Sequence, residues 1–287
     1  MSPEIIGRWQ AERIASGAGR TSVLKALTLL GAILQRAMES GRITRNPVRL
    51  VRKAARPRRR EVRPLAPVTV EALRNVSSER DAALISVLAY AGLRPQEALA
   101  LSWVHVRKRT ILVERAVSLG DIDDTKTDAH RTVRLLKPLA DDLECWRRQS
   151  RPRHESALVY PGVNGEPWTR AAYKDWTRKT ARGRRKRDGE RSGSGGPFGR
   201  AAIAAGVPAA TPYALRHSFA SLLLHEGRSV MYVARQLGHG AQLTLSTYGH
   251  VIGELDDAPR ISAEDAISAA RASSCVTGVS RRPVDAA

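Results

Sequence analysis

The hydrophobic pattern of the first sixty residues predicts a small helical module. Over residues 21–41 apolar side chains recur every three or four positions, as on one buried helix face: Val23, Leu27, Leu30, Leu34 and Ala37. Thr21 and Ser22 favour a helix N-cap, and a glycine follows the last apolar residue. Residues 3–15 predict a shorter helix, and another piece begins at Asn46. Residues 56–67 combine proline with a run of charge, so we expect a linker there.

A larger domain is predicted after this linker, and it begins with helices. Thr69 is placed to cap a first helix, and Asp81 to open a second over residues 82–91. The second segment is apolar on nearly all sides, so we expect it to be buried and to end at Gly92.

The pattern changes to β-branched residues over 104–136. Residues 110–113 and 132–135 predict strands of a small antiparallel sheet, with a loop over 120–130. Residues 178–200 are rich in arginine and glycine, which predicts a mobile basic loop.

Further helix starts are marked by capping residues. Pro95 suits the first position of a helix, which makes Arg94 its N-cap. Thr211 and Ser229 each precede a helical segment that ends at a glycine, and residues 262–273 form a last alanine-rich helical stretch.

These elements predict a mainly α fold with a small antiparallel β-sheet. We expect a short helical module over residues 1–63, a larger domain over 64–258 and a C-terminal helix and tail over 259–287.

The net charge of +20 points to a polyanionic partner. Residues 1–64 alone hold fifteen Lys and Arg against four Asp and Glu. The abundance of arginine over lysine fits a GC-rich coding sequence, but that does not explain the excess of positive over negative charge. Nucleic acid is therefore the expected partner, ahead of an acidic membrane surface.

Several classes of protein are excluded by what the sequence lacks. No apolar run reaches the roughly 18 residues of a membrane span, and the first twenty residues do not form a signal peptide, so a cytoplasmic protein is expected. Two cysteines cannot make a disulfide framework or a cysteine zinc site. Without a phosphate-binding glycine loop or a metal motif, we expect neither a cofactor nor a metal.

Five motifs resemble the ordered boxes of the tyrosine recombinases, the phage integrase family. Residues 91–101 (AGLRPQEALAL) resemble the first arginine box, and residues 211–220 (TPYALRHSFA) the second. The Leu-Gly-His of residues 237–239 resembles the third box, and Tyr248 follows His239 by nine residues, as the family's nucleophile does. Lys126, shortly before the predicted strand 132–135, looks like the β-hairpin lysine.

The resemblance implies metal-free strand cleavage, and the chemistry of the residues agrees. Tyr248 would attack phosphorus and give a 3′-phosphotyrosyl linkage, which needs no ATP to reseal. Arg94 and Arg216 would bind the non-bridging oxygens, because planar guanidinium groups fit phosphate bidentately. Lys126 would protonate the leaving 5′-oxygen, and His239 would hydrogen bond to phosphate or assist proton transfer.

The remaining residues of the motifs receive supporting roles. Glu97 can reach Arg94 on one helix face, either to orient it or simply to complement the helix dipole. We expect His217 and His250 to be structural, because helix periodicity turns His217 away from Arg216.

Two features depart from the family pattern. Tyr213 stands where the second box usually has histidine, and a tyrosine can donate a hydrogen bond but is a poor base near neutral pH. Residues 1–63 are also fewer than the family's core-binding domain usually has, so we expect that module to be truncated.

The resemblance predicts a site-specific recombinase that acts on duplex DNA as a homo-tetramer through a Holliday junction. Two alternatives remain open: a type IB topoisomerase that relaxes DNA as a monomer, and a truncated integrase that only binds DNA.

Overall fold

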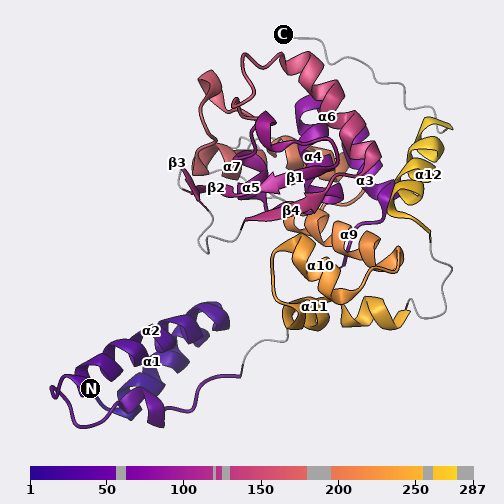
Figure 1. Ribbon diagram of the computed structural model, residues 1–287. Helices are drawn as coiled ribbons and strands as arrows, with labels where there is room; N and C mark the ends of the chain where they lie inside the picture. The colour runs from indigo at the N-terminus through magenta and orange to yellow at the C-terminus, as the bar shows by residue number, and fades with distance from the viewer. Residues whose placement is uncertain (56–62, 119–120, 125–129, 180–194, 255–260, 277–287) are drawn as a thin grey trace, which may run out of the picture. The chain divides into compact units, whose positions relative to one another are not determined.

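The computed structural model describes residues 1–55, 63–118, 121–124, 130–179, 195–254 and 261–276. The chain divides into two compact units, Met1–Glu61 and Val62–Ala287. Figure 1 shows the helices and strands of each unit. No helix within the described residues has the length and hydropathy needed to cross a membrane.

Unit 1 is a helical hairpin closed by a short 3-10 helix. Helices α1 (Pro3–Ala15) and α2 (Arg20–Glu39) pack with η1 (Pro47–Leu50) around Ile6, Leu27 and Val48. The Asn46 side chain accepts a hydrogen bond from the Val48 N–H and donates one to the carbonyl of residue 31. The N-cap of α2 is Gly19, so the predicted caps Thr21 and Ser22 lie in its first turn instead.

Unit 2 begins with three helices: α3 (Pro67–Asn75), α4 (Glu79–Tyr90) and α5 (Pro95–Leu99). Helix α3 starts before the predicted cap Thr69, because Pro67 already has the backbone angle of a first helical residue. Ser78, rather than Asp81, caps α4 by accepting a hydrogen bond from the Asp81 N–H. The central residues of α4 are buried on all sides, as its sequence predicts.

The antiparallel strands form two short ladders rather than one sheet. Strand β1 (Thr110–Val113) pairs with β4 (Arg131–Arg134), and β2 (Arg115–Ser118) pairs with β3 (Asp121–Asp124). The break falls at Glu114, whose carboxylate pairs with His105 in η2 (Trp103–His105) at 2.8 Å. The first ladder contributes Ile111 and Val133 to the core.

Three more helices, and η3 (Val163–Gly165), lie between the strands and the second arginine box. They are α6 (Lys137–Ser150), α7 (Arg170–Trp176) and α8 (Pro197–Ala204). Trp176 packs between Trp168 and Phe198, and Gly196 leaves no room for a Cβ against the α7 backbone. The prediction of a loop over 178–200 is wrong at residues 197–200, which this packing folds into α8; residues 180–194 lie outside the described residues.

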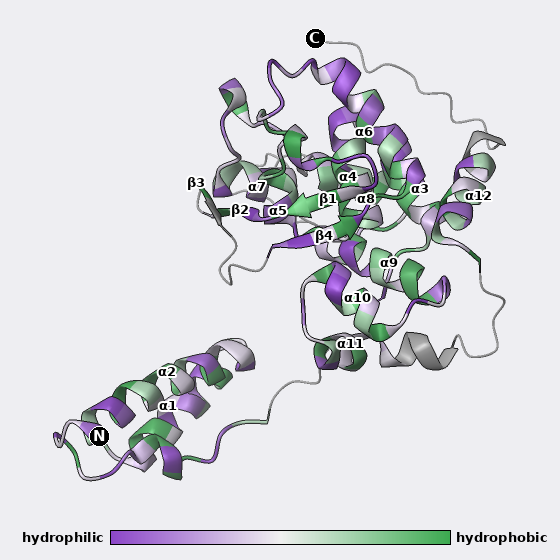
Figure 2. Ribbon diagram, viewed as in Figure 1, coloured by the Kyte–Doolittle hydropathy of each residue, from purple (hydrophilic) through white to green (hydrophobic). Residues whose placement is uncertain are grey.

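The last four helices complete the unit: α9 (Pro212–His225), α10 (Val230–Leu237), α11 (Ala241–Glu254) and α12 (Ala263–Val276). Thr211 and Ser229 cap α9 and α10 as predicted. Hydrophobic residues gather on β1 and α9, and α10 and α11 lie next to α9 (Figures 1 and 2).

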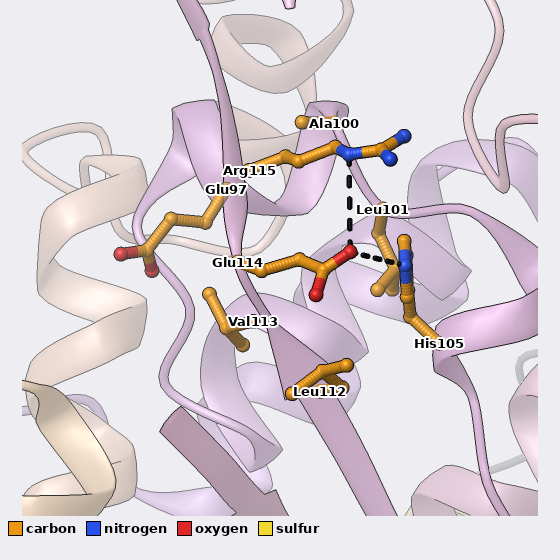
Figure 3. Close-up of a pocket in the computed structure, with 8 residues that line it drawn as sticks. All are labelled: Glu97, Ala100, Leu101, His105, Leu112, Val113, Glu114 and Arg115. Carbon is orange, nitrogen blue, oxygen red and sulfur yellow. Dashed lines mark ion pairs between the residues drawn. The ribbon is translucent and has the colours of Figure 1, made fainter. Parts of the chain in front are cut away.

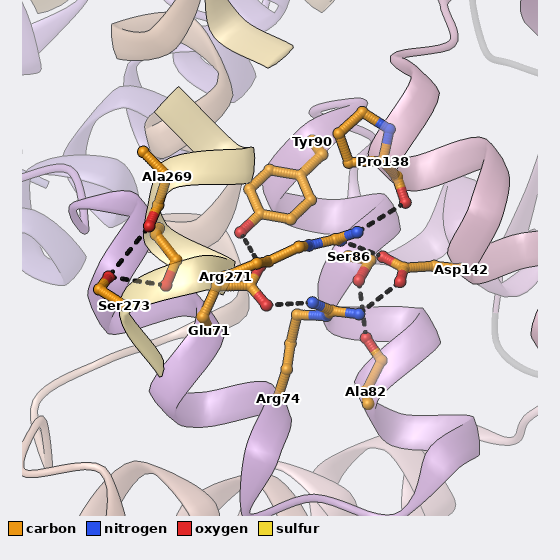
Figure 4. Close-up of polar contacts among 11 residues, drawn as sticks. Glu71, Arg74, Ala82, Ser86, Tyr90, Pro138, Asp142, Ala269, Arg271 and Ser273 are labelled. Carbon is orange, nitrogen blue, oxygen red and sulfur yellow. Dashed lines mark hydrogen bonds and ion pairs between the residues drawn. The ribbon is translucent and has the colours of Figure 1, made fainter. Parts of the chain in front are cut away.

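Helix α12 is joined to the core by both apolar and ionic contacts. It lies along α3 and buries Ala263 and Ile267 (Figure 1). Arg271 reaches Asp142 of α6 at 2.7 Å and Glu71 of α3 at 3.5 Å (Figure 4). The mainly helical fold with small antiparallel β-structure is therefore confirmed.

Candidate active site

A glycine turn after α4 sets the geometry of the site. Gly92 has a φ of +62°, and a Cβ there would collide with the ring of Phe219 on α9. Only glycine tolerates both the positive φ and this close approach. The turn places Arg94 at the N-cap of α5, as the sequence predicts, and leaves the Gly92 carbonyl facing α9.

Glu97 is the centre of the charged cluster. Its side chain is buried, and its Oε2 accepts a hydrogen bond of 2.7 Å from the Arg94 backbone N–H. Its Oε1 accepts another of 2.7 Å from Nη1 of the Arg94 guanidinium. Glu97 therefore fixes both the backbone N–H and the guanidinium group of Arg94. The second terminal guanidinium nitrogen of Arg94 donates a hydrogen bond of 3.0 Å to the Gly238 carbonyl.

Arg131 at the start of β4 is a third charged partner that the sequence analysis missed. Its two terminal nitrogens donate to the two carboxylate oxygens of Glu97 at 2.8 and 2.6 Å. Its Nε donates to the Gln236 carbonyl at 3.0 Å, which ties β4 to the end of α10.

Arg216 joins three segments of the chain. Its side chain is 5% exposed, and its terminal nitrogens donate to the carbonyls of Gly92 and Leu237. One of these nitrogens also lies 3.8 Å from Glu97. Burial, followed by the charge of Arg94, lowers the pKa of Arg216 to about 9, so the guanidinium stays charged at neutral pH.

The turn between α10 and α11 brings in His239. Gly238 ends α10 in the left-handed conformation, with a φ of +65°. The His239 Nδ1 lies 3.0 Å from the Thr244 hydroxyl. Burial, then the charges of Arg216, Arg94 and Arg131, lower the pKa of His239 to about 4, so its imidazole is neutral at pH 7.

Tyr248 lies on α11 with its hydroxyl directed at α9. Tyr248 is 1% exposed, and its Oη lies 2.5 Å from the Nδ1 of His217. It is close enough to Arg216 to affect the pKa of that guanidinium. His217, which we expect to be structural, contacts Tyr248: the rotation that turns it from the contacts of Arg216 points it at Tyr248.

The structure thus brings Arg94, Glu97, Arg216, His239 and Tyr248 together. Tyr213, in the first turn of α9, is 47% exposed and lies near Tyr173 of α7, and none of the hydrogen bonds and ion pairs described for the site includes it. Lys126 and the side chain of His250 lie outside the described residues.

Glu97 also lines a small pocket, and the lining of this pocket includes none of Arg94, Arg131 and Arg216. Figure 3 shows the Glu97 carboxylate pointing away from Glu114, which pairs with His105 and Arg115 on the other side. Across the described ranges, no group of three or more His, Cys, Asp or Glu side chains is arranged to hold a metal ion.

The electrostatics of the cluster favour an anion. Three guanidinium groups surround one carboxylate, which leaves an excess of two positive charges. Their donors are fixed by carbonyls and by Glu97 before any ligand arrives. Such preorganised donors stabilise charge that develops on a phosphate during reaction.

Comparison with known proteins identifies the family. The model of the phage integrase family matches residues 65–254, about two thirds of the chain. The chain belongs to the phage integrase family. Relatives of this integrase-family chain include the prophage integrase IntR of Escherichia coli K12, 30% identical over 247 residues, which cover 83% of this chain and 60% of the relative. Another is the tyrosine recombinase XerC of Mycobacterium leprae, 28% identical over 88% of this chain and 80% of the relative.

Solved integrase structures share the fold. The Tn1549 transposon integrase in complex with transposon right end DNA aligns with a TM-score of 0.66 and 19% identity, over 86% of this chain and 81% of that one. The lambda integrase bound to DNA aligns with a TM-score of 0.62 and 17% identity, over 91% and 85%.

Two residues of the candidate site had weak signals in the sequence. Arg131 lies in a predicted β-region among many arginines, and nothing in its local pattern indicates a buried partner. His217 follows Arg216 directly, and only the position of α11 shows that it reaches Tyr248.

Proposed function

We propose that this integrase-family chain is a site-specific recombinase that cuts and rejoins duplex DNA through a covalent bond to Tyr248. One observation carries the proposal: Arg94, Arg216, His239 and Tyr248 come from separate segments of unit 2 and meet around one buried cluster. A tyrosine beside fixed guanidinium groups is suited to attack a phosphodiester.

Arg94 and Arg216 bind the non-bridging oxygens of the scissile phosphate. A guanidinium carries five N–H donors, more than the two that the carbonyls of Gly92 and Leu237 take from Arg216. Arg216 can therefore bind phosphate without losing its place. Glu97 and Arg131 keep Arg94 in position, and His239, neutral at pH 7, donates a further hydrogen bond.

The reaction exchanges one phosphodiester for another. The Tyr248 oxygen forms a bond to phosphorus while the bond to the 5′-oxygen breaks, which leaves a 3′-phosphotyrosyl linkage and a 5′-hydroxyl. Lys126 supplies the proton for the departing oxygen. The hydroxyl of Tyr213 donates a hydrogen bond to the phosphate.

The partner is double-stranded DNA. The active form is a homo-tetramer, and the reaction proceeds through a Holliday junction. The Tn1549 and lambda integrases were solved bound to DNA, and +20 of net charge suits the same partner. In this proposal residues 1–63 bind DNA as a short core-binding module, residues 64–258 carry out catalysis, and residues 259–287 form a C-terminal helix and tail.

The experiment is covalent trapping on a nicked suicide substrate. Tyr248→Phe removes one oxygen and keeps the ring, so DNA affinity should be retained while the protein–DNA adduct disappears from a denaturing gel. Tyr232→Phe, a partly buried tyrosine on the neighbouring helix α10, is the matched control and should form the adduct at the wild-type rate.

The other outcomes assign the function differently. An adduct that persists in Tyr248→Phe would move the nucleophile elsewhere, with Tyr213 tested next. Relaxation of supercoiled plasmid without recombination would favour the topoisomerase reading. A wild-type protein that binds DNA and forms no adduct would be a binding protein only.

A further inference from the structure

The contact between His217 and Tyr248 places an imidazole on the atom that would react. The His217 Nδ1 lies 2.5 Å from the Tyr248 Oη, and the two ring centroids are 5.6 Å apart at an angle of 62°. Tyr248 is 1% exposed, so its hydroxyl proton meets this nitrogen in a site from which bulk water is largely excluded.

The helix geometry of α9 makes Arg216 and His217 serve two different neighbours. Adjacent residues of an α-helix point about 100° apart. Arg216 therefore reaches the carbonyls of Gly92 and Leu237, while His217 reaches α11. One turn of α9 therefore carries both Arg216, which is assigned to bind the phosphate, and His217, which contacts the proposed nucleophile Tyr248.

The proposed reaction needs a proton acceptor that the other candidates supply poorly. A phenol must lose its proton as it attacks, and an ordinary tyrosine holds that proton until about pH 10. Tyr213 carries a hydroxyl, which is a poor base near neutrality. His239 is a weak base because burial, and then the surrounding arginines, lower its pKa, and its Nδ1 contacts Thr244.

We propose that His217 is the general base for Tyr248 in cleavage and returns the proton in rejoining. This inference rests on the proposed function. The hydroxyl of Tyr248 donates to the unprotonated Nδ1; as the Oη–phosphorus bond forms, the proton moves to Nδ1. The phosphorus–O5′ bond breaks with its electron pair on the 5′-oxygen, which takes a proton from the acid assigned to Lys126. Rejoining reverses each transfer.

Single-turnover cleavage of the suicide substrate by the full chain tests the base. His217→Gln keeps a polar side chain but accepts no proton near neutral pH, so adduct formation should slow by roughly 10²–10⁴-fold with unchanged DNA affinity. His225→Gln is the matched control, because it is the same change at an exposed position of α9, and it should cleave at the wild-type rate.

A pair of substrate and tyrosine analogues separates base from acid. Difluorotyrosine at position 248 is more acidic than tyrosine, so it needs less help from a base. It should restore most of the rate of His217→Gln and little of Lys126→Ala. A 5′-bridging phosphorothiolate, whose sulfur leaves without a proton, should restore Lys126→Ala and not His217→Gln.

Each other result overturns the inference or the function beneath it. If His217→Gln cleaves like His225→Gln, or if difluorotyrosine leaves its defect unchanged, His217 is not the base. Where His217→Gln fails to fold by circular dichroism, His217→Asn carries the same test. If wild type forms no adduct, or Tyr248→Phe still does, the proposed function fails first.

Discussion

At the scale of single residues, Glu97 controls the charge of the cluster. Burial alone would raise its pKa, but the hydrogen bonds and charge of Arg131, the Arg94 N–H and the charge of Arg216 lower it to about 2. The carboxylate is therefore ionised at all pH values at which the protein would work, and it holds the guanidinium groups in place.

Replacing Glu97 should cost stability as well as activity. Glu97→Gln leaves buried arginines without their counter-charge, so we expect a loss of about 3–5 kcal/mol in the free energy of unfolding. Urea denaturation at pH 7 measures it, and Glu144→Gln at an exposed pair of α6 should change it by less than about 0.5 kcal/mol.

The same carboxylate predicts a pH dependence of this difference. Because the folded pKa of Glu97 lies below the ordinary value of 4.5 for a glutamate, its contribution to stability is complete above about pH 4.5 and is lost as the pH falls through about 2. The stability gap between wild type and Glu97→Gln should therefore narrow over that range. A gap that stays constant would mean that Glu97 does not act through its charge.

Tyr213 provides a second test at this scale. If its hydroxyl only donates a hydrogen bond to the phosphate, Tyr213→Phe should slow cleavage about ten- to a hundredfold, or about 1.4–2.8 kcal/mol of barrier. Tyr213→His should be neutral or favourable. Rate constants for adduct formation measure both effects. A Tyr213→His protein that forms no adduct would show that residue 213 does not face the phosphate in the proposed way.

At the scale of elements, α12 is part of the core that supports the site. Ile267 is fully buried, so Ile267→Ala should lower the free energy of unfolding by about 2–5 kcal/mol. Ile261→Ala, the same change at a position that is 55% exposed, should shift it by less than about 0.5 kcal/mol. Equal effects in urea denaturation would show that α12 does not pack stably on α3.

The elements also show what could be predicted from sequence. Helix starts were predictable where a side chain caps or a proline leads, as at Arg94, Thr211 and Ser229. The predicted start was wrong where a better capping residue lay just upstream, as Ser78 lies before Asp81. Helix α8 was missed because its stability comes from packing on the tryptophans of a distant segment.

The candidate site follows the same division. The motifs of the two arginine boxes, the third box and the nucleophile could be read locally, and the structure brings those residues together. The contacts of Arg131 with Glu97 and of His217 with Tyr248 join positions about thirty residues apart in the chain. The hydrophobic periodicity of the sequence does not predict such pairs, because they depend on how whole helices and strands pack.

At the scale of the whole molecule, charge should govern affinity for DNA. If about six phosphates are neutralised, log K should fall with log salt at a slope of about −5. The Tyr248→Phe protein allows this to be measured without covalent capture. A slope near zero would contradict the role given to the net charge.

Two double variants test which positive charges contact DNA phosphates. Changing Arg45 and Arg49 of unit 1 to Gln should reduce the magnitude of the slope by about 2, at roughly 0.9 for each lost phosphate contact. Arg148 and Arg151 at the end of α6 are also exposed, and the same change there should leave the slope as it was.

The carbonyl contacts of Arg216 have a consequence for how such genes decay. Because this guanidinium joins the turn at Gly92 to the end of α10, selection for a folded protein alone would preserve it. Loss of the Tyr248 oxygen removes its hydrogen bond with His217, at a cost of about 1 kcal/mol, which a copy of the protein can lose and still fold. An intact Arg216 therefore records an inherited fold, while the Tyr248 phenol would record selection for the strand cleavage proposed for this chain.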